Sequence, residues 1–301
     1  MSNKAQVSIV VLTRNAQKYL DQLLKGVYKQ TYKDFEILVI DSKSSDRTID
    51  IIKKYPVKLI SIDPKDFGHG KTRNYGARLA NGKIVVYLTH DAIPRNTAWL
   101  TEIIKPLENN KVAGVFARQI ARNNAIPMEK FFYYQMYPKT KRIWTKNNLK
   151  LDEIIFSNAS SAVKKHFILS NPFPEDILMS EDREWGINMV NKGYEIHYEP
   201  KAIVTHSHNT KPKQLFQRYF DFGISHENID DKAKTKSFLN KGLRLYIYEF
   251  KYLITKGYIQ WLPYSIIYNS AKFFGLFLGK YHNIIPVYIK VRISGYGRYL
   301  R

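Results

Sequence analysis

Short apolar runs alternate with segments of helical periodicity along the first part of the chain. The apolar runs are typical of strands that are buried on both faces of a sheet, and they cover residues 7–12, 35–40, 57–60, 84–88 and 112–116. Helical spacing and capping residues predict helices at about 16–28, 46–55, 71–80 and 99–107. Strands that alternate with helices predict an α/β fold with a mostly parallel central sheet flanked by helices.

The pattern is less regular after residue 117. Residues 118–156 are rich in aromatic and basic side chains but have no clear period, and we interpret them as a substrate-facing excursion. Ser180 is a candidate N-cap for a helix that Gly193 ends. Two strand-like runs follow at 194–198 and 202–204.

The remaining chain, from about residue 215, has a helical pattern and much of the positive charge. The formal net charge is +22, and residues 231–301 contain 13 Lys and Arg but only two acidic residues. Residues 261–289 are apolar but interrupted by Lys272, Lys280 and Pro286, which is poor material for a spanning helix. We predict that 226–301 forms a basic, amphipathic helical extension that lies on a membrane surface or mediates self-association.

Composition restricts the chemistry further. The 301-residue chain is 44% hydrophobic, which is enough for a substantial core, and it has no cysteine. Disulfides, thiolate catalysis and cysteine-ligated zinc are therefore excluded. The first residues lack the apolar segment of a signal peptide, so we expect a cytoplasmic protein.

Polar residues follow several predicted strands directly. Thr13, Arg14 and Asn15 follow the first strand, and Asp41 and Ser42 end the second. The carboxyl ends of parallel strands meet at one edge of a sheet, where α/β proteins bind ligands, so a nucleotide site is expected there. Each group alone is only a strand-to-helix turn, and the absence of a glycine-rich dinucleotide fingerprint argues against NAD or FAD.

A second group of residues is suited to phosphate. Residues 66–74 combine two glycines with Lys71 and Arg73 at a predicted helix start, which favours an anion. A flexible basic loop is the alternative interpretation. Asp91 follows the fourth strand, and by itself it is more simply interpreted as a helix-capping acid before Pro94.

The last candidates are an acidic pair and two histidines. Glu181 and Asp182 lie in the first turn of a predicted helix, where acids are favoured electrostatically in any case. His206 and His208 alternate, so a continuing strand would let only one of them share a metal with Asp91. One carboxylate and one imidazole suit Mg²⁺ or Mn²⁺ better than zinc.

Taken in order, these motifs resemble the GT-A glycosyltransferases of family 2 over residues 5–225. Asp41-Ser-Lys-Ser-Ser-Asp-Arg-Thr48 is similar to their nucleotide loop, Thr89-His-Asp91 to a degenerate DxD motif, and Glu181-Asp182 to the ED base motif. Two segments further resemble the bacterial rhamnosyltransferase branch, which uses dTDP-L-rhamnose. They are Phe67-Gly-His-Gly-Lys-Thr-Arg-Asn74 and Thr89-His-Asp-Ala-Ile-Pro94. Thr89 replaces the first DxD aspartate, so only Asp91 is carried over as a carboxylate ligand.

The resemblance implies a GT-A nucleotide-diphospho-sugar transferase fold and a set of roles. Asp41 would pair with the thymine edge, Arg73 would approach the diphosphate, Asp91 and His206 would bind Mg²⁺ or Mn²⁺, and Asp182 would be the catalytic base. The other implied nucleotide-sugar-binding residues are Thr13, Arg14, Asn15, Ser42, His69, Lys71, Asn74, His90 and Glu181. The catalytic domain would span 1–225, with a nucleotide-binding half at about 1–117 and an acceptor-side half at about 118–225.

The implied activity is inverting transfer of a sugar, with L-rhamnose from dTDP-β-L-rhamnose as the expected donor. The implied acceptor is a lipid-linked saccharide at the inner membrane face, used for a bacterial cell-wall or capsular polysaccharide. Another nucleotide sugar, such as a UDP-linked one, is the main alternative. A non-catalytic sugar-nucleotide scaffold and a nucleic-acid-binding protein are further alternatives, although no known nucleic-acid motif is found and no nucleic-acid partner is expected. The sequence leaves open whether the protein forms a homo-oligomer.

Overall fold

The computed structural model describes residues 5–149, 156–225 and 232–296, with the backbone alone for 232–241. The chain divides into two compact units. The first consists of Met1–Arg122, Tyr133–Asp176 and Glu181–Ser207, and the second of Asn123–Phe132, Ile177–Ser180 and His208–Arg301. The boundary expected between residues 225 and 226 therefore falls within the second unit.

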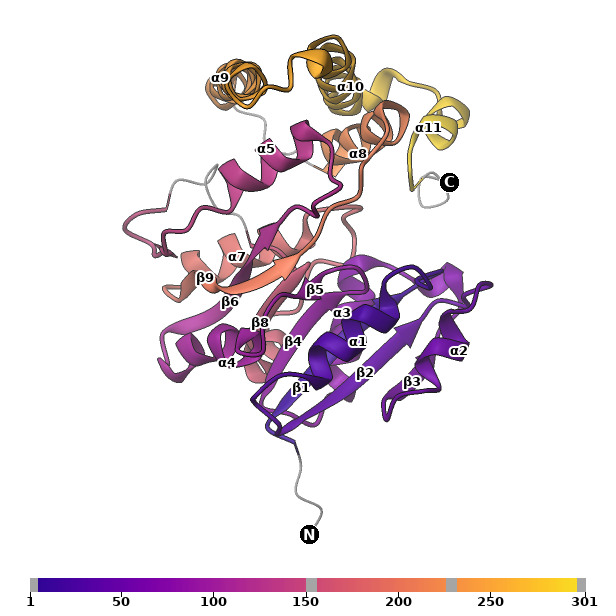
Figure 1. The fold of residues 1–301 in the computed structure, drawn as a ribbon, viewed down its shortest axis with the longest axis vertical. Helices are drawn as coiled ribbons and strands as arrows, with labels where there is room; N and C mark the ends of the chain where they lie inside the picture. Colours follow the sequence, from indigo (N-terminus) through magenta and orange to yellow (C-terminus); the bar gives the residue numbers. More distant parts are fainter. Residues whose placement is uncertain (1–4, 150–155, 226–231, 297–301) are drawn as a thin grey trace. The chain divides into compact units, whose positions relative to one another are not determined.

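The first unit is built on a sheet with the strand order β3-β2-β1-β4-β8-β6-β9-β5, and β7 pairs with β9 (Figure 1). Its strands are β1 (Val7–Thr13), β2 (Phe35–Asp41), β3 (Lys58–Ser61), β4 (Ile84–Thr89), β5 (Ile93–Pro94), β6 (Val112–Ile120), β7 (Arg142–Trp144), β8 (Ser160–Lys164) and β9 (Glu195–Thr205). The expected strands at 7–12, 35–40, 57–60, 84–88 and 112–116 are confirmed, with small shifts at their ends.

The direction of the strands changes in the middle of the sheet. The first four strands along the chain, β1 to β4, pair with one another in parallel, as predicted. β8 is antiparallel to both β4 and β6, and β5 and β7 are antiparallel to β9, so the sheet is mixed. Because β8 runs opposite to β4, its amino end lies at the edge where β4 ends.

Helices cover both faces of this sheet. The helices of the first unit are α1 (Leu20–Tyr28), α2 (Thr48–Ile52), α3 (His69–Leu79), α4 (Trp99–Ile104), α6 (Lys165–Ser170) and α7 (Glu181–Asn191), and α5 (Pro127–Met136) crosses the boundary between the units. Successive strand residues point to opposite faces, so the apolar runs of β1, β2 and β4 supply side chains to both. This explains why they appear as continuous apolar segments rather than alternating ones.

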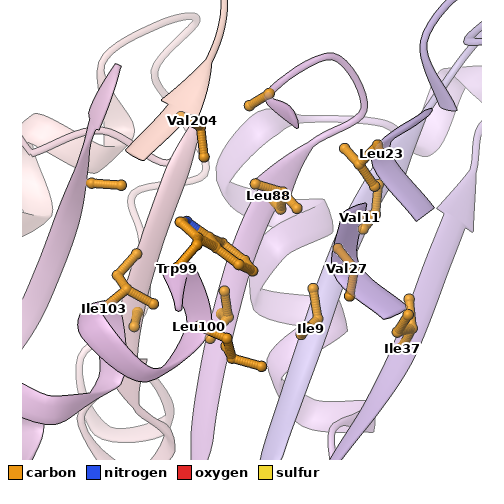
Figure 2. Packing of buried hydrophobic residues seen from close by; sticks show 14 of the residues in the cluster. Ile9, Val11, Leu23, Val27, Ile37, Leu88, Trp99, Leu100, Ile103 and Val204 are labelled. Carbon is orange, nitrogen blue, oxygen red and sulfur yellow. The ribbon is translucent and has the colours of Figure 1, made fainter. Parts of the chain in front are cut away.

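One face packs against α1, α2 and α4. Its buried cluster contains Val11 of β1, Leu23 of α1 and Trp99 of α4. Figure 2 shows the Trp99 ring among side chains of β4, α4 and β9. The indole N–H of Trp99 donates to the Ser160 hydroxyl at 3.0 Å, which satisfies the polar atom of this buried ring. Full burial of a side chain of this size stabilises the fold by roughly 1.5–3 kcal/mol.

The other face packs against α3, α6 and α7. Aromatic side chains fill it, including Phe116 of β6, Phe156, and Trp185 of α7. Gly114 of β6 lies beneath this aromatic layer, and a Cβ atom there would be 2.9 Å from the Trp185 ring. The absence of a side chain at Gly114 therefore lets α7, which carries candidate site residues, pack close to the sheet.

Several sequence-based expectations are corrected. The segment 118–156, which showed no clear period, contains the end of β6, the whole of α5, and β7. The two strands expected at 194–198 and 202–204 are one strand, β9, whose pairing with β6 shifts register near Pro200. Ser180 has a φ of 70°, whereas an N-cap residue is extended, so its expected capping role is wrong. Gly193 ends α7 as predicted, with a φ of 90°.

The second unit is helical, as predicted for the chain after residue 215. It contains α8 (Pro212–Ser225), α9 (Lys232–Thr255), α10 (Leu262–Lys280) and α11 (Val287–Ile293). α8 and α10 approach closely at glycines: a Cβ at Gly279 would lie 2.2 Å from the carbonyl oxygen of Phe220. In the part of the chain that the structure describes, none of the helices combines the length and apolar character needed to cross a bilayer.

The close contact at the start of α3 gives a stability prediction. A Cβ at Gly70 would lie 2.0 Å from the carbonyl oxygen of Pro174, and backbone at that distance has to move. We expect Gly70→Ala to lower the free energy of unfolding by about 3 kcal/mol, the upper end of ordinary overpacking costs. The measurement is the urea unfolding midpoint of the purified protein.

The neighbouring glycine provides the control. A Cβ at Gly68 would meet only the Lys71 Cβ, at 3.4 Å, so Gly68→Ala should cost about 1 kcal/mol or less. Equal stability of the two variants would contradict the close packing of α3 against the Pro174 segment.

Candidate active site

The carboxyl ends of β1, β2 and β4 lie side by side, as the sequence predicted. Thr13 is in register with Asp41, and Leu12 is in register with Thr89. The polar residues that end these three strands therefore lie along one edge of the sheet in the first unit. This is the edge at which open α/β sheets bind ligands.

Asp41 joins the loops after β1 and β2. Its carboxylate accepts hydrogen bonds from the Thr13 hydroxyl at 2.8 Å, the Ser44 backbone N–H at 2.8 Å and the Ser44 hydroxyl at 2.6 Å. Asn15, in the left-handed region at φ 50°, accepts a 2.9 Å bond from the backbone N–H of Ser45. A carboxylate has about four acceptor positions, so Asp41 retains capacity for a further donor while it fixes both loops.

Arg73 of α3 and Glu181 of α7 form a buried ion pair. Both side chains are less than a tenth exposed, so an unpaired charge at either position would be strongly unfavourable. Arg73 was predicted to approach a diphosphate, and in this structure its guanidinium contacts Glu181. The pair fixes the start of α7 against α3.

The remaining residues of the 66–74 segment differ in their surroundings. The Asn74 amide group donates to the Phe173 carbonyl and to Glu175, and its oxygen accepts from the Phe173 N–H. This fastens α3 to the segment before α7, so Asn74 has a structural function. Lys71 is exposed and lies 3.9 Å from Asp66, and His69 is half-buried.

Asp91 and His206 come together after β4 and β9. The His206 Nε2 atom lies 3.5 Å from the Asp91 Oδ1 atom, and both residues are less than a tenth exposed. β9 ends at Thr205, so both histidines follow the strand, and the alternation of strand side chains that separated them does not apply. His208 is assigned to the second unit, whose last segment it begins.

Two residues that sequence reasoning missed hold this pair in place. Gln119 of β6 has its side-chain oxygen 2.7 Å from the His206 Nδ1 atom. Arg122 donates to the backbone carbonyls of Asp91 and Ser207, and its guanidinium lies 4.0 Å from the centre of the Tyr19 ring. Arg122 thereby fixes the two segments that carry the candidate metal ligands. The available signal was a polar Gln119 three residues beyond the predicted apolar strand 112–116.

Asp182 lies in the first turn of α7 and is held by two backbone donors. Its Oδ2 atom accepts from the Asn158 N–H and its Oδ1 atom from the Arg183 N–H, each at 2.8 Å. Burial raises the pKa of Asp182 to about 6, and the negative charge of Glu181 adds to the shift. Arg73 and the two N–H donors act in the opposite direction. A carboxyl group with such a pKa can exchange a proton near neutral pH.

The segment before β8 connects Asp182 with the end of β4. The Asn158 N–H binds Asp182, and the carbonyl oxygen of the next residue, Ala159, accepts from the Thr89 N–H at 3.1 Å. In the residue before Asn158, the Ser157 hydroxyl accepts a 3.0 Å hydrogen bond from the Gln119 amide. A chain of hydrogen bonds thus runs from the Asp91 and His206 pair through Gln119 to the segment that holds Asp182.

The structure therefore gathers most of the predicted residues into a few local groups of the first unit. The groups are Thr13, Asn15 and Asp41; Arg73, Glu181 and Asp182; and Asp91 with His206. Ser42 is buried beside Asp41, His90 is half-buried between Thr89 and Asp91, and Arg14 is exposed. The roles assigned to these residues stay predictions.

A mixed sheet of this order, covered by helices on both faces and with acidic residues at the carboxyl edge of its parallel strands, is the arrangement of a glycosyltransferase of the GT-A fold. The chain belongs to glycosyl transferase family 2, whose family model matches residues 8–165. It is accordingly a glycosyltransferase, and the expected fold and family are confirmed.

Two relatives cover nearly the whole chain. The O-antigen chain rhamnosyltransferase WbaN of Salmonella anatum is 34% identical over 287 residues, which is 93% of this chain and 91% of the relative. The O-antigen chain rhamnosyltransferase RfbN of Salmonella typhimurium is 28% identical over 289 residues, covering 94% and 92%. The resemblance to rhamnosyltransferases is therefore confirmed.

Solved structures agree on the fold. The mannosyltransferase PcManGT from Pyrobaculum calidifontis, in complex with GDP-Man and Mn²⁺, has a TM-score of 0.62 at 18% identity and covers 94% of this chain and 88% of its own. Staphylococcus aureus TarS 1–349 in complex with UDP-GlcNAc has a TM-score of 0.56 at 18% identity, covering 98% and 88%. At these identities the likeness concerns the fold alone.

The electrostatic surroundings of Asp182 give a second prediction. The Asp182 carboxyl group should titrate near pH 6, and Glu181→Gln should lower its pKa, because the substitution removes a neighbouring negative charge and leaves Arg73 positive. The measurement is the carbon chemical shift of the carboxyl group by NMR as a function of pH.

Glu184→Gln is the matched control on the same helix. Glu184 is partly exposed and pairs with Arg183, so its removal should leave the Asp182 titration in place. A midpoint that stays constant or rises in Glu181→Gln would contradict the assigned charge interaction.

Proposed function

We propose that this glycosyltransferase transfers L-rhamnose from dTDP-β-L-rhamnose, with inversion, to a lipid-linked saccharide acceptor in bacterial cell-wall or capsular polysaccharide synthesis. The names of its two relatives, both rhamnosyltransferases of an O-antigen chain, support the sugar and the kind of product. The observation that carries the mechanism is the hydrogen-bonded segment 157–159, which ties Asp182 to the end of β4.

The residues at the end of β4 and β9 suit a hard divalent cation. The Asp91 carboxylate and the His206 imidazole supply one oxygen and one nitrogen, a set that fits Mg²⁺ or Mn²⁺ and leaves positions for phosphate oxygens. When bound, such an ion would neutralise negative charge on the departing diphosphate. His208, two residues along the chain, is the alternative imidazole ligand.

Asp182 is the proposed general base. The two backbone N–H groups that bind its oxygens fix the orientation of the carboxylate, and the remaining lone pairs can accept the proton of the attacking hydroxyl. A base placed opposite the leaving group gives a single displacement with inversion, so the β-linked donor yields an α-L-rhamnoside. A pKa of about 6 leaves the carboxylate mostly unprotonated at neutral pH.

The donor nucleotide is proposed to bind at the loops joined by Asp41. Asp41 would accept from the N–H of the thymine edge, and Thr13 and Asn15 would line the nucleoside pocket, with the other predicted residues of β1, β2 and α3 around the sugar diphosphate. A UDP-linked sugar presents the same imide edge, so UDP donors are the principal alternative. In this proposal residues 1–117 bind the nucleotide and 118–225 face the acceptor.

The helices of the second unit support a peripheral position on the inner face of the cell membrane. Apolar side chains are exposed along α10 and beyond it, including Ile266, Ile267, Phe273, Phe274, Phe277 and Ile284. Lys272, Lys280, Lys290 and Arg292 lie on the same segment. Exposed apolar side chains among basic ones are typical of helices that lie in the bilayer interface. Self-association through these helices is the competing explanation.

One set of assays tests both the identity of the sugar donor and the role of Asp182 as the base. Incubation with dTDP-β-L-rhamnose, Mn²⁺ and membrane lipid extract should consume the donor, whereas UDP-linked and GDP-linked sugars should be left intact. Asp182→Asn should reduce transfer by roughly 10²-fold or more while donor binding stays near normal, because it removes only the proton acceptor. Donor consumption is measured by chromatography, and donor binding by calorimetry.

The outcomes separate the two claims. Consumption of a UDP-linked sugar in preference to the dTDP-linked one would overturn the donor assignment but leave the mechanism. Full turnover by Asp182→Asn would remove Asp182 from the mechanism whichever sugar is used.

Membrane binding is tested with point substitutions. Deleting residues 231–301 would also remove α10, whose close packing on α8 is part of the core of the second unit. Phe274 is 55% exposed, and we expect Phe274→Glu to reduce partitioning to anionic lipid vesicles about tenfold or more, the effect of losing one buried aromatic ring. Sedimentation with vesicles measures this.

The control is Leu169→Glu on α6 of the first unit, where Leu169 is 51% exposed. It introduces the same charge at a similarly exposed apolar residue and should leave vesicle binding unchanged. Equal partitioning of wild type and Phe274→Glu would show that this part of α10 does not contact the bilayer.

A further inference from the structure

Arg122 is a half-buried cation to which the proposed mechanism assigns no chemical role. It follows the end of β6, and its guanidinium donates to the backbone carbonyls of Asp91, after β4, and Ser207, after β9. Its own backbone N–H donates to the Ser207 hydroxyl at 3.1 Å. All three residues belong to the first unit. The guanidinium therefore has a fixed place at the edge of the sheet where the candidate site residues lie.

An aromatic ring also fixes the orientation of this guanidinium. The central carbon of the Arg122 guanidinium lies over the ring of Tyr19, 4.0 Å from the ring centre, and Tyr19 comes just before α1 in the segment that follows β1. The Lys18 Nζ atom lies 5.0 Å from the centre of the same ring. A planar guanidinium that stacks on a ring and donates from its edge is held in one orientation. Two positive charges thus share one ring at this edge.

The charge of Arg122 differs from that of Arg73 in its partners. In the described part of the chain, the contacts of Arg122 are backbone carbonyls, a serine hydroxyl and an aromatic ring, and none of them is a carboxylate. The guanidinium of Arg73 is instead paired with Glu181. A cation that is partly withdrawn from water is stabilised by a counter-charge. A guanidinium has more N–H donors than the two that bind carbonyls, so Arg122 can also bind an anion.

We propose that Arg122 contacts the diphosphate of the donor and stabilises the departing nucleoside diphosphate. This inference rests on the proposed binding of a nucleotide sugar at this edge. Arginine suits the task because its planar fork of N–H donors matches two phosphate oxygens. As the acceptor oxygen bonds to the anomeric carbon and loses its proton to Asp182, the bond from that carbon to the diphosphate oxygen breaks. Negative charge then grows on the departing oxygen, where a fixed cation is most effective.

Phosphorus-31 NMR titration of dTDP, UDP and inorganic pyrophosphate tests this assignment. EDTA is present, so that the candidate metal ligands do not contribute. Arg122→Gln removes the charge but keeps an amide donor for a carbonyl, and it should weaken diphosphate binding about 10- to 100-fold, the effect of losing one hydrogen-bonded charge. Arg122→Lys keeps the charge and should lose less affinity. Binding of thymidine and uridine, which have no phosphate, should be unchanged in both variants.

Arg118→Gln is the matched control. Arg118 is also a half-buried arginine of the first unit, in β6, and it donates to the Tyr137 carbonyl at 3.1 Å. Its substitution removes the same charge and should leave diphosphate affinity unchanged. Near-UV circular dichroism reports on the folding of each variant. Wild-type diphosphate affinity in a folded Arg122→Gln would overturn the proposal, and so would an equal loss of nucleoside binding, because Arg122 would then only hold the loops.

The wild-type protein provides a readout that is independent of how Arg122→Gln folds. The side-chain Nε–H signal of Arg122 in a nitrogen-15 NMR spectrum, identified by its absence in Arg122→Lys, should shift when pyrophosphate is added but not when thymidine is added. A signal that stays constant at saturating pyrophosphate would contradict a contact between Arg122 and the diphosphate.

These outcomes are distinct from those that test the donor. Tighter binding of UDP than of dTDP would overturn the donor assignment and leave the role of Arg122 intact, because both nucleotides have the same diphosphate. Equal diphosphate binding by wild type and Arg122→Gln would overturn the role of Arg122 alone. Failure of the wild type to bind any of the three diphosphates would overturn both proposals.

Discussion

The antiparallel insertion of β8 between β4 and β6 is the constraint on which the site depends. Strands that run parallel deliver their carboxyl ends to one edge, and a strand of opposite direction delivers its amino end there. Residues 157–159 therefore enter the edge from β8, where they can bind Thr89, Gln119 and Asp182. Without this reversal, β4 and α7 would have no short backbone connection at the site.

The ion pair of Arg73 and Glu181 has two effects that are linked electrostatically. It neutralises a buried glutamate at the start of α7. Burial is the main cause of the raised pKa of Asp182, and within the pair the Glu181 charge adds to this shift while the Arg73 charge opposes it. Arg73 is also the residue expected to approach the donor diphosphate. Any change that moves its positive charge away from Asp182 would make that carboxylate a stronger base.

The sequence was most informative where one local pattern determines the structure. Apolar runs such as 84–88 predicted the parallel strands, and the polar residues after them, Thr13 and Asp41, were correctly expected at one edge. Pairing across long sequence separations has no local signal, so the sequence could not show that β8 lies between β4 and β6. Gln119 and Arg122 were missed for the same reason, since their importance comes from partners about 30 to 90 residues away.

In the second unit, Asp221 of α8 is fully buried and is bound by the Ser294 hydroxyl and the backbone N–H of Gly295. Burial raises the pKa of this carboxyl group, and these donors oppose the shift. The residues just after α11 thus bind α8 through its buried carboxyl group. A protein truncated before Ser294 would leave the buried Asp221 carboxyl group without these donors, so any truncation should end beyond Gly295.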